Sequence, residues 1–207
     1  MNIPDFIIYF SLALTYSFFG SMPPATGNLL TIQLSITRGL KAALIFALGE
    51  VIIEFIYGYV AWLISDFITE KTNYDFHLKV IAIPIFLIMA LYFFISKKPI
   101  EKETEIKQNR NFIYGLLIGV LNPLAIPFWV VNISYFFSND WIKKDSSDFW
   151  FFIAGIPVGS FLLLFVYALL GKKIYSILKF RIELLNRVIA IIFILLAVLQ
   201  TILLLNG

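Results

Sequence analysis

The sequence predicts an all-α polytopic membrane protein of six transmembrane helices, arranged as two inverted three-helix repeats in which helices 1 and 4 are discontinuous. The composition, the succession of apolar segments and two proline-rich interruptions predict this fold. Of the 207 residues, 60% are hydrophobic and 14% are charged, and the mean hydropathy is +0.90. A soluble domain needs more polar surface than this, whereas a bundle of membrane helices does not. The absence of cysteine excludes disulfides and thiolate metal sites.

Six apolar segments are candidates for transmembrane helices, which need about 20 residues each to cross the hydrocarbon core. The expected spans are 6–34, 42–64, 80–96, 112–137, 149–170 and 184–205. The first is long enough for two half-helices, and the third is short and contains Pro84, which favours a tilt or a kink. The spans define a first three-helix repeat (1–96), a polar cytoplasmic linker (97–111) and a second three-helix repeat (112–207).

The first and fourth spans are each interrupted by residues that break helices. The interrupting residues are Gly20, Pro23, Pro24 and Gly27 in the first span, and Pro123 and Pro127 in the fourth. A proline inside a helix costs about 3 kcal/mol or more, because it lacks the N–H and clashes with the preceding turn. In hydrocarbon, broken backbone survives only inside protein or beside a wet cavity. Interruptions at matching places in two halves therefore indicate the binding site of a secondary transporter.

The distribution of basic residues predicts the orientation. Loops one, three and five hold most of the 16 Lys and Arg residues, whereas loops two and four hold Lys71, Lys79, Lys143 and Lys144. The positive-inside rule then places the odd loops in the cytoplasm and both termini on the extracytoplasmic side. Because the basic residues serve orientation, no nucleic-acid partner is expected. The chain starts without a basic n-region, so we expect the first span to be a permanent helix and not a removed signal.

Glu50 and Glu54 are the acidic residues that lie well inside a predicted span, the second. A carboxylate at the bilayer centre costs about 2.5–3.5 kcal/mol on insertion scales, so these two must be protonated, paired or exposed to water. Four residues apart, they lie on one helix face and resist ionising together. We therefore expect the pair to couple proton movement to transport. The alternative is that both lie near the headgroups, or that one only bonds to the broken helix.

Neutral polar residues beside the interruptions are candidates for substrate binding. Thr26 and Asn28 follow the first interruption, Asn122 opens the second, and Trp129 lies just beyond it. Half-helix N-termini suit a carboxylate, and unwound carbonyls suit an ammonium or another cation. These side chains could bind a zwitterion without burying a fixed charge. The alternative is that the Asn and Thr side chains only satisfy carbonyls that the prolines leave free.

Small residues spaced by about one helical turn are expected to let helix backbones approach closely. The glycines interpreted in this way are Gly49, Gly58, Gly115, Gly119, Gly155 and Gly159.

Four stretches of the chain together resemble the lysine-exporter (LysE/RhtB) family of bacterial amino-acid exporters. They are the Gly/Pro break late in span one, Thr-Arg-Gly-Leu-Lys-Ala-Ala at 37–43, Ala-Leu-Gly-Glu at 47–50, and the segment 112–125, which starts at Phe112 and contains Gly115 and Gly119-Val-Leu-Asn-Pro-Leu-Ala. The chain departs from the family pattern in having Met-Pro-Pro-Ala at 22–25 for Pro-Gly-Pro, Leu124 for a lysine, Glu50 for an aspartate, and Ile-Pro-Ile at 83–85 where a glycine is common. These departures indicate a divergent member.

The resemblance implies a protein of the bacterial cell (inner) membrane that exports amino acids or similar small metabolites, driven by the proton gradient, and that forms a homodimer. By position, it implies functional roles for Pro23, Pro24, Glu50, Asn122 and Pro123. No cofactor is expected.

Other functions remain open at this stage. A divalent-cation exporter could use Glu50 and Glu54 with carbonyl oxygens from the breaks as ligands. An integral-membrane enzyme is not expected, because the predicted spans contain no histidine and only these two glutamates. A non-transport membrane scaffold would tolerate replacement of Glu50. The leading prediction is a proton-coupled exporter of an amino-acid-like solute.

Overall fold

The computed structural model is helical throughout the residues it describes, which are 4–23, 25–69, 74–95, 110–122, 125–143 and 147–205. These residues form eight helices and no strand, which confirms the predicted all-α class. The helices are α1 (Asp5–Gly20), α2 (Thr26–Arg38), α3 (Leu40–Thr69), α4 (Tyr74–Ile95), α5 (Asn111–Val120), α6 (Ala125–Ser138), α7 (Phe149–Leu169) and α8 (Gly171–Leu205).

Both predicted interruptions fall between helices. The first expected span is divided into α1 and α2, which residues 21–25 separate. The fourth is divided into α5 and α6, whose directions differ by 62°. Pro127 lies in the first turn of α6, where a helix needs no backbone N–H, so it does not interrupt that helix. Pro24 and Pro123 lie outside the described residues.

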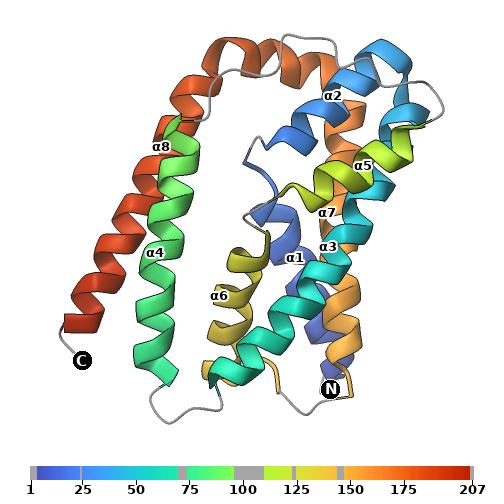
Figure 1. The fold of residues 1–207 in the computed structure, drawn as a ribbon. Coiled ribbons are helices and arrows are strands. Elements are labelled where there is room, and N and C mark those ends of the chain that lie inside the picture. The colour runs from blue at the N-terminus through green and yellow to red at the C-terminus, as the bar shows by residue number, and fades with distance from the viewer. Residues whose placement is uncertain are drawn as a thin grey trace.

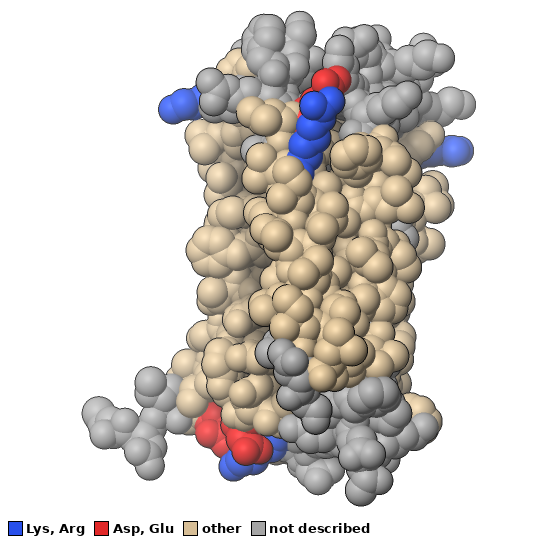
Figure 2. Space-filling view, turned by 90° about the vertical axis from the view of Figure 1, so that its left-hand side faces the viewer, with Lys and Arg blue, Asp and Glu red and all other residues tan. Residues whose placement is uncertain are grey.

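Helix length and composition identify part of the expected set of spans. Among the described residues, Leu40–Phe67 of α3 and Phe149–Leu169 of α7 are each long and apolar enough to cross a membrane, and α5 with α6 makes a third if the pair is one broken span. The apolar stretches of α1, α4 and α8 are shorter. On the face shown in Figure 2, charged side chains gather at the two ends and a broad uncharged band lies between them.

The chain runs back and forth between two ends of the molecule, and both termini lie at the same end (Figure 1). The first half-helix α1 packs along α7, α5 packs along α3, and α4 packs along α8. The pair of α4 and α8 makes few contacts with the other helices. Each half of the broken fourth span and the second half of the first span contact α3, which makes α3 the central helix of the fold.

Helix α8 starts earlier than the sequence predicts. It begins at Gly171, whereas the sixth span is expected to start at 184. Figure 1 shows that its first turns cross the upper end of the molecule and that the rest descends beside α4. The stretch before 184 is rich in Lys and Arg, which favour helix as strongly as many apolar residues do but lower the hydropathy. Hydropathy locates membrane depth, and it misses helix that lies outside the apolar band.

Glycines hold the broken helices close to their neighbours, which confirms the packing role expected for them. A Cβ added at Gly115 of α5 would collide with the backbone of α3 at Phe46, and one at Gly155 of α7 would collide with the backbone of α1 at Phe10. The same applies to Gly159, whose added Cβ would meet the carbonyl oxygen of Leu14. Both half-helices that precede a break therefore lie in backbone contact with an unbroken helix.

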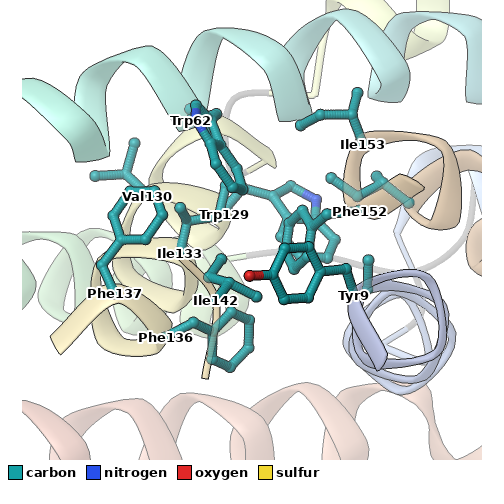
Figure 3. Packing of buried hydrophobic residues seen from close by; sticks show 13 residues of the cluster. Tyr9, Trp62, Trp129, Val130, Ile133, Phe136, Phe137, Ile142, Phe152 and Ile153 are labelled. Carbon is teal, nitrogen blue, oxygen red and sulfur yellow. The ribbon is translucent and has the colours of Figure 1, made fainter. Parts of the chain in front are cut away.

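The largest buried cluster is aromatic and is formed by α1, α3, α6 and α7 (Figure 3). Trp62 of α3 meets Phe137 of α6 edge to face, with 4.8 Å between ring centres. Trp129 of α6 meets Phe152 of α7 in the same manner at 5.9 Å. Edge-to-face pairs at these distances add to the stability from apolar burial. The cluster therefore holds the Trp129 indole firmly in place.

Candidate functional site

A cavity of about 230 Å³ lies where the two helix breaks meet. Its walls come from the end of α1, the start of α2, α3, both breaks, the start of α6, and the pair of α4 and α8. The polar lining consists of Ser17, Ser21, Asn28, Glu50, Glu54 and Asn122. The large apolar side chains of the lining are Phe19, Met89, Phe93, Phe128, Trp129 and Phe193.

The structure brings together most of the residues that the sequence singles out. The predicted residues that line the cavity are Gly20, Pro23, Asn28, Glu50, Glu54, Asn122 and Trp129. Thr26 is an exposed residue of the first turn of α2 and is outside the lining, as are Gly27 and Pro127. The positions of Pro24 and Pro123 lie outside the described residues. The predicted carboxylates and the predicted breaks thus share one cavity.

Glu50 is buried against the start of α2, with only 7% of its surface exposed. A Cβ added at Gly27 would overlap the Glu50 carboxylate, so the glycine makes room for it. Ala25 precedes α2 and provides no side-chain cap, which leaves the positive end of the helix dipole for the carboxylate. Glu50 Oε2 has no hydrogen-bond partner among the described residues. A buried oxygen of this kind is costly, and a proton, an ammonium group or a cation would satisfy it.

Glu54 lies one turn further along α3 and has Ser160 of α7 as a hydrogen-bonding neighbour. The Ser160 hydroxyl lies 2.9 Å from that of Ser17 and 2.8 Å from that of Ser21. Ser17 donates its own hydrogen bond to the carbonyl oxygen of Ile156, at 2.7 Å. A cluster of hydroxyl groups therefore connects Glu54 to the end of α1, immediately before the first break.

The Asn28 side chain binds the backbone of the first break. Its side-chain nitrogen donates to the carbonyl oxygens of Ser21 and Pro23, at 2.7 and 2.8 Å. Both carbonyls belong to residues of the break, so the amide replaces helical bonds that are missing there. This is the structural role that the sequence left open for Asn28. Only the side-chain oxygen remains available to a solute.

Two tyrosines that the sequence analysis does not single out bind the backbone at the breaks. Tyr167 of α7 donates to the carbonyl oxygen of Met22 at 2.6 Å, and Tyr57 of α3 donates to that of Val120 at 2.8 Å. Each tyrosine comes from the opposite half of the chain to the break that it binds. The signal in the sequence is weak, but Tyr57 does follow Glu50 by seven residues and so lies on the same helix face.

The other missed residues are Ser160 and the apolar side chains that α4 and α8 contribute, Met89, Phe93 and Phe193. A serine in a transmembrane segment is common and carries no signal of its own, and an apolar residue in an apolar span carries even less. Within the described part of the chain, no three His, Cys, Asp or Glu side chains come together as a metal site.

Comparison with known proteins identifies the family of the chain. Residues 18–203 match the family model described as LysE type translocator. The chain belongs to the LysE type translocator family. The match includes both breaks and both cavity glutamates, and it confirms the resemblance seen in the sequence. Together with the long apolar helices, membership identifies a multi-pass membrane protein that transports amino acids or similar solutes. No curated protein and no solved structure matches the chain.

Proposed function

We propose that this LysE-type translocator is a secondary transporter of the bacterial inner membrane that exports an amino-acid-like metabolite in exchange for protons. The observation that carries the proposal is the cavity at the two breaks, which contains both membrane-depth glutamates. Glu50 Oε2 is buried there without a partner among the described residues, so it needs a proton or a cationic group.

Exchange follows from competition at the carboxylates. A proton and a positively charged amino group satisfy the same buried oxygen, and each excludes the other. A transporter that changes the side to which its cavity opens only when the cavity holds a solute or a proton couples export of the solute to the proton gradient. The membrane potential alone contributes about 2.3 kcal/mol per 100 mV for each charge moved.

The packing pattern supports an arrangement of six spans in two inverted repeats. This arrangement would underlie the change of access that carries the solute across the membrane. The half-helix before each break packs against the middle span of the other half, α1 on α7 and α5 on α3, while α4 and α8 pair with each other. If each of these helices is replaced by its counterpart in the other half of the chain, the same set of pairings results. Inverted repeats of this kind alternate their access by rocking one part against another. The few contacts of α4 and α8 with the other helices suit such a movement.

The experiment is solute-driven proton movement in proteoliposomes with a trapped pH dye. Wild type is compared with Glu50→Gln and with a matched control, Glu183→Gln, at an exposed position on α8. The panel contains amino acids, amines and divalent cations. We expect at least one amino acid or amine to drive proton flux in wild type and the control, and Glu50→Gln to abolish it.

The alternative outcomes have separate meanings. Flux driven by divalent cations alone would favour a cation exporter that uses Glu50 and Glu54. Flux that survives Glu50→Gln would remove this residue from the coupling mechanism. No flux with any solute would contradict the exporter and favour a non-transport scaffold.

A further inference from the structure

The charge of the cavity has one sign. Glu50 and Glu54 are the charged side chains of its lining, and the lining residues from α1, α2, α4, α6 and α8 include no Lys, Arg or His among those described. The side-chain nitrogen of Asn28 is already committed to the carbonyls of Ser21 and Pro23. For a negatively charged group, the described lining therefore offers only neutral donors such as Ser21 and the Trp129 indole.

One of the two helix N-termini that could bind a solute carboxylate is already occupied. A helix N-terminus attracts an anion, and two helices begin at this cavity, α2 just after Ala25 and α6 at Ala125. The Glu50 carboxylate lies at the start of α2, against Gly27. In a cavity of about 230 Å³, a zwitterion whose ammonium group binds the glutamates would hold its own carboxylate close to them, and like charges at close range repel strongly where water is excluded.

The rest of the lining suits a cation with an apolar body. Phe93, Phe128, Trp129 and Phe193 line the cavity, and Phe93 and Trp129 are almost completely buried. Aromatic faces attract ammonium groups and pack against apolar chains. The volume of about 230 Å³ is below the roughly 300–1,000 Å³ of pockets for drug-sized ligands, which indicates a small solute.

We propose that the preferred solute is a small organic amine with an apolar body and no free carboxylate. Aromatic and aliphatic amines belong to this class, as do amino acids whose carboxyl group is masked as an amide or ester. The ammonium group binds Glu50 and Glu54, and the apolar body lies among the aromatic side chains. This inference rests on the proposed function, since it specifies the solute of the same cavity.

The test is equilibrium binding to the purified full-length protein by titration calorimetry. Four ligands share one phenyl ring and cover three charge states. Phenethylamine and phenylalaninamide are cations, phenylalanine is a zwitterion, and 3-phenylpropionate is an anion. We expect the two ligands without a carboxylate to bind at least about tenfold more tightly than phenylalanine, because like-charge juxtaposition is unfavourable. We expect no binding of 3-phenylpropionate. Trp129→Leu should weaken phenethylamine binding, while the control Trp150→Leu, at an exposed position, should leave it unchanged.

Three results would overturn the inference. Phenylalanine could bind as tightly as phenethylamine, 3-phenylpropionate could bind, or none of the four could bind. Proton flux in proteoliposomes is recorded separately with the same panel of amino acids, amines and divalent cations. Flux with zwitterions alone would leave the exporter standing and reject the amine, whereas amine binding without flux from any solute would reject the exporter and keep the binding site.

Discussion

At the scale of single residues, the contact between Glu50 and Gly27 has the strongest consequences for function. The carboxylate occupies space that any side chain at position 27 would fill. The carboxylate lies at the positive end of the α2 dipole, and no described residue forms a hydrogen bond with its Oε2, which keeps that oxygen available. A glycine in the first turn of a helix is otherwise unremarkable, and here it is the counterpart of an acidic residue on another helix.

Gly27→Ala should therefore act like a mutation of Glu50. The added methyl group forces the carboxylate away from the start of α2, and we expect solute-driven proton flux to fall by roughly ten- to a hundredfold, as misplacement of a functional group by about 1 Å can do. The measurement is flux in proteoliposomes at matched protein density. Gly171→Ala is the control, because a Cβ there meets neighbours only at ordinary contact distances. Equal flux in the two variants would contradict the role of Gly27.

Residues also differ in how readily their roles can be predicted from the sequence. Glu50 and Glu54 were predictable because a charge at membrane depth is expensive and therefore stands out. Ser160, Tyr57 and Tyr167 were not, because hydroxyl groups are tolerated throughout membrane helices and their roles depend on which carbonyl or carboxylate the fold places beside them.

At the scale of elements, the two broken helices are held together by side chains from elsewhere. The sequence predicts both breaks because proline and glycine act on their own backbone, so their effect is local. Asn28, a partner of the carbonyls in the first break, is close along the chain. Tyr57 and Tyr167 are distant from the carbonyls that they bind, and only the fold reveals them. Helix boundaries also differ in how well the sequence predicts them. The two breaks lie where the sequence predicts them. The start of α8 does not, because it depends on helix-forming polar residues that hydropathy does not detect.

Tyr57→Phe and Tyr167→Phe should each loosen one break. Each substitution removes one hydrogen bond to a backbone carbonyl, at 2.8 and 2.6 Å respectively. We expect a loss of about 0.5–1.5 kcal/mol in the free energy of unfolding for each, and nearly additive losses in the double variant. Thermal or denaturant unfolding in detergent gives the values. Tyr59→Phe is the control on α3, where the ring stacks on Trp150; an equal loss there would contradict the assignment.

At the scale of the whole molecule, both termini lie at one end, and the face shown in Figure 2 has an uncharged band between two charged ends. The six crossings expected from the sequence, an even number, would place both termini at the same end. The distribution of Lys and Arg then predicts which end faces the cytoplasm.

The orientation can be measured directly because the chain has no cysteine. Single cysteines are introduced as Thr37→Cys, at the end of α2, and Asn139→Cys, just after α6, both at exposed positions. With a membrane-impermeant maleimide on intact spheroplasts, we expect Asn139→Cys to be labelled and Thr37→Cys to be protected until the cells are lysed. The reverse pattern would mean that the basic loops face outward.

The tyrosine bonds also impose an order on biogenesis. Tyr57 precedes the carbonyl that it binds by 63 residues, so it is already in place when the ribosome delivers the second break. Tyr167 follows its carbonyl by 145 residues, so the first break enters the bilayer long before its partner has been synthesised. Until α7 has been synthesised, the carbonyl oxygen of Met22 lacks the tyrosine hydroxyl that binds it in the folded protein.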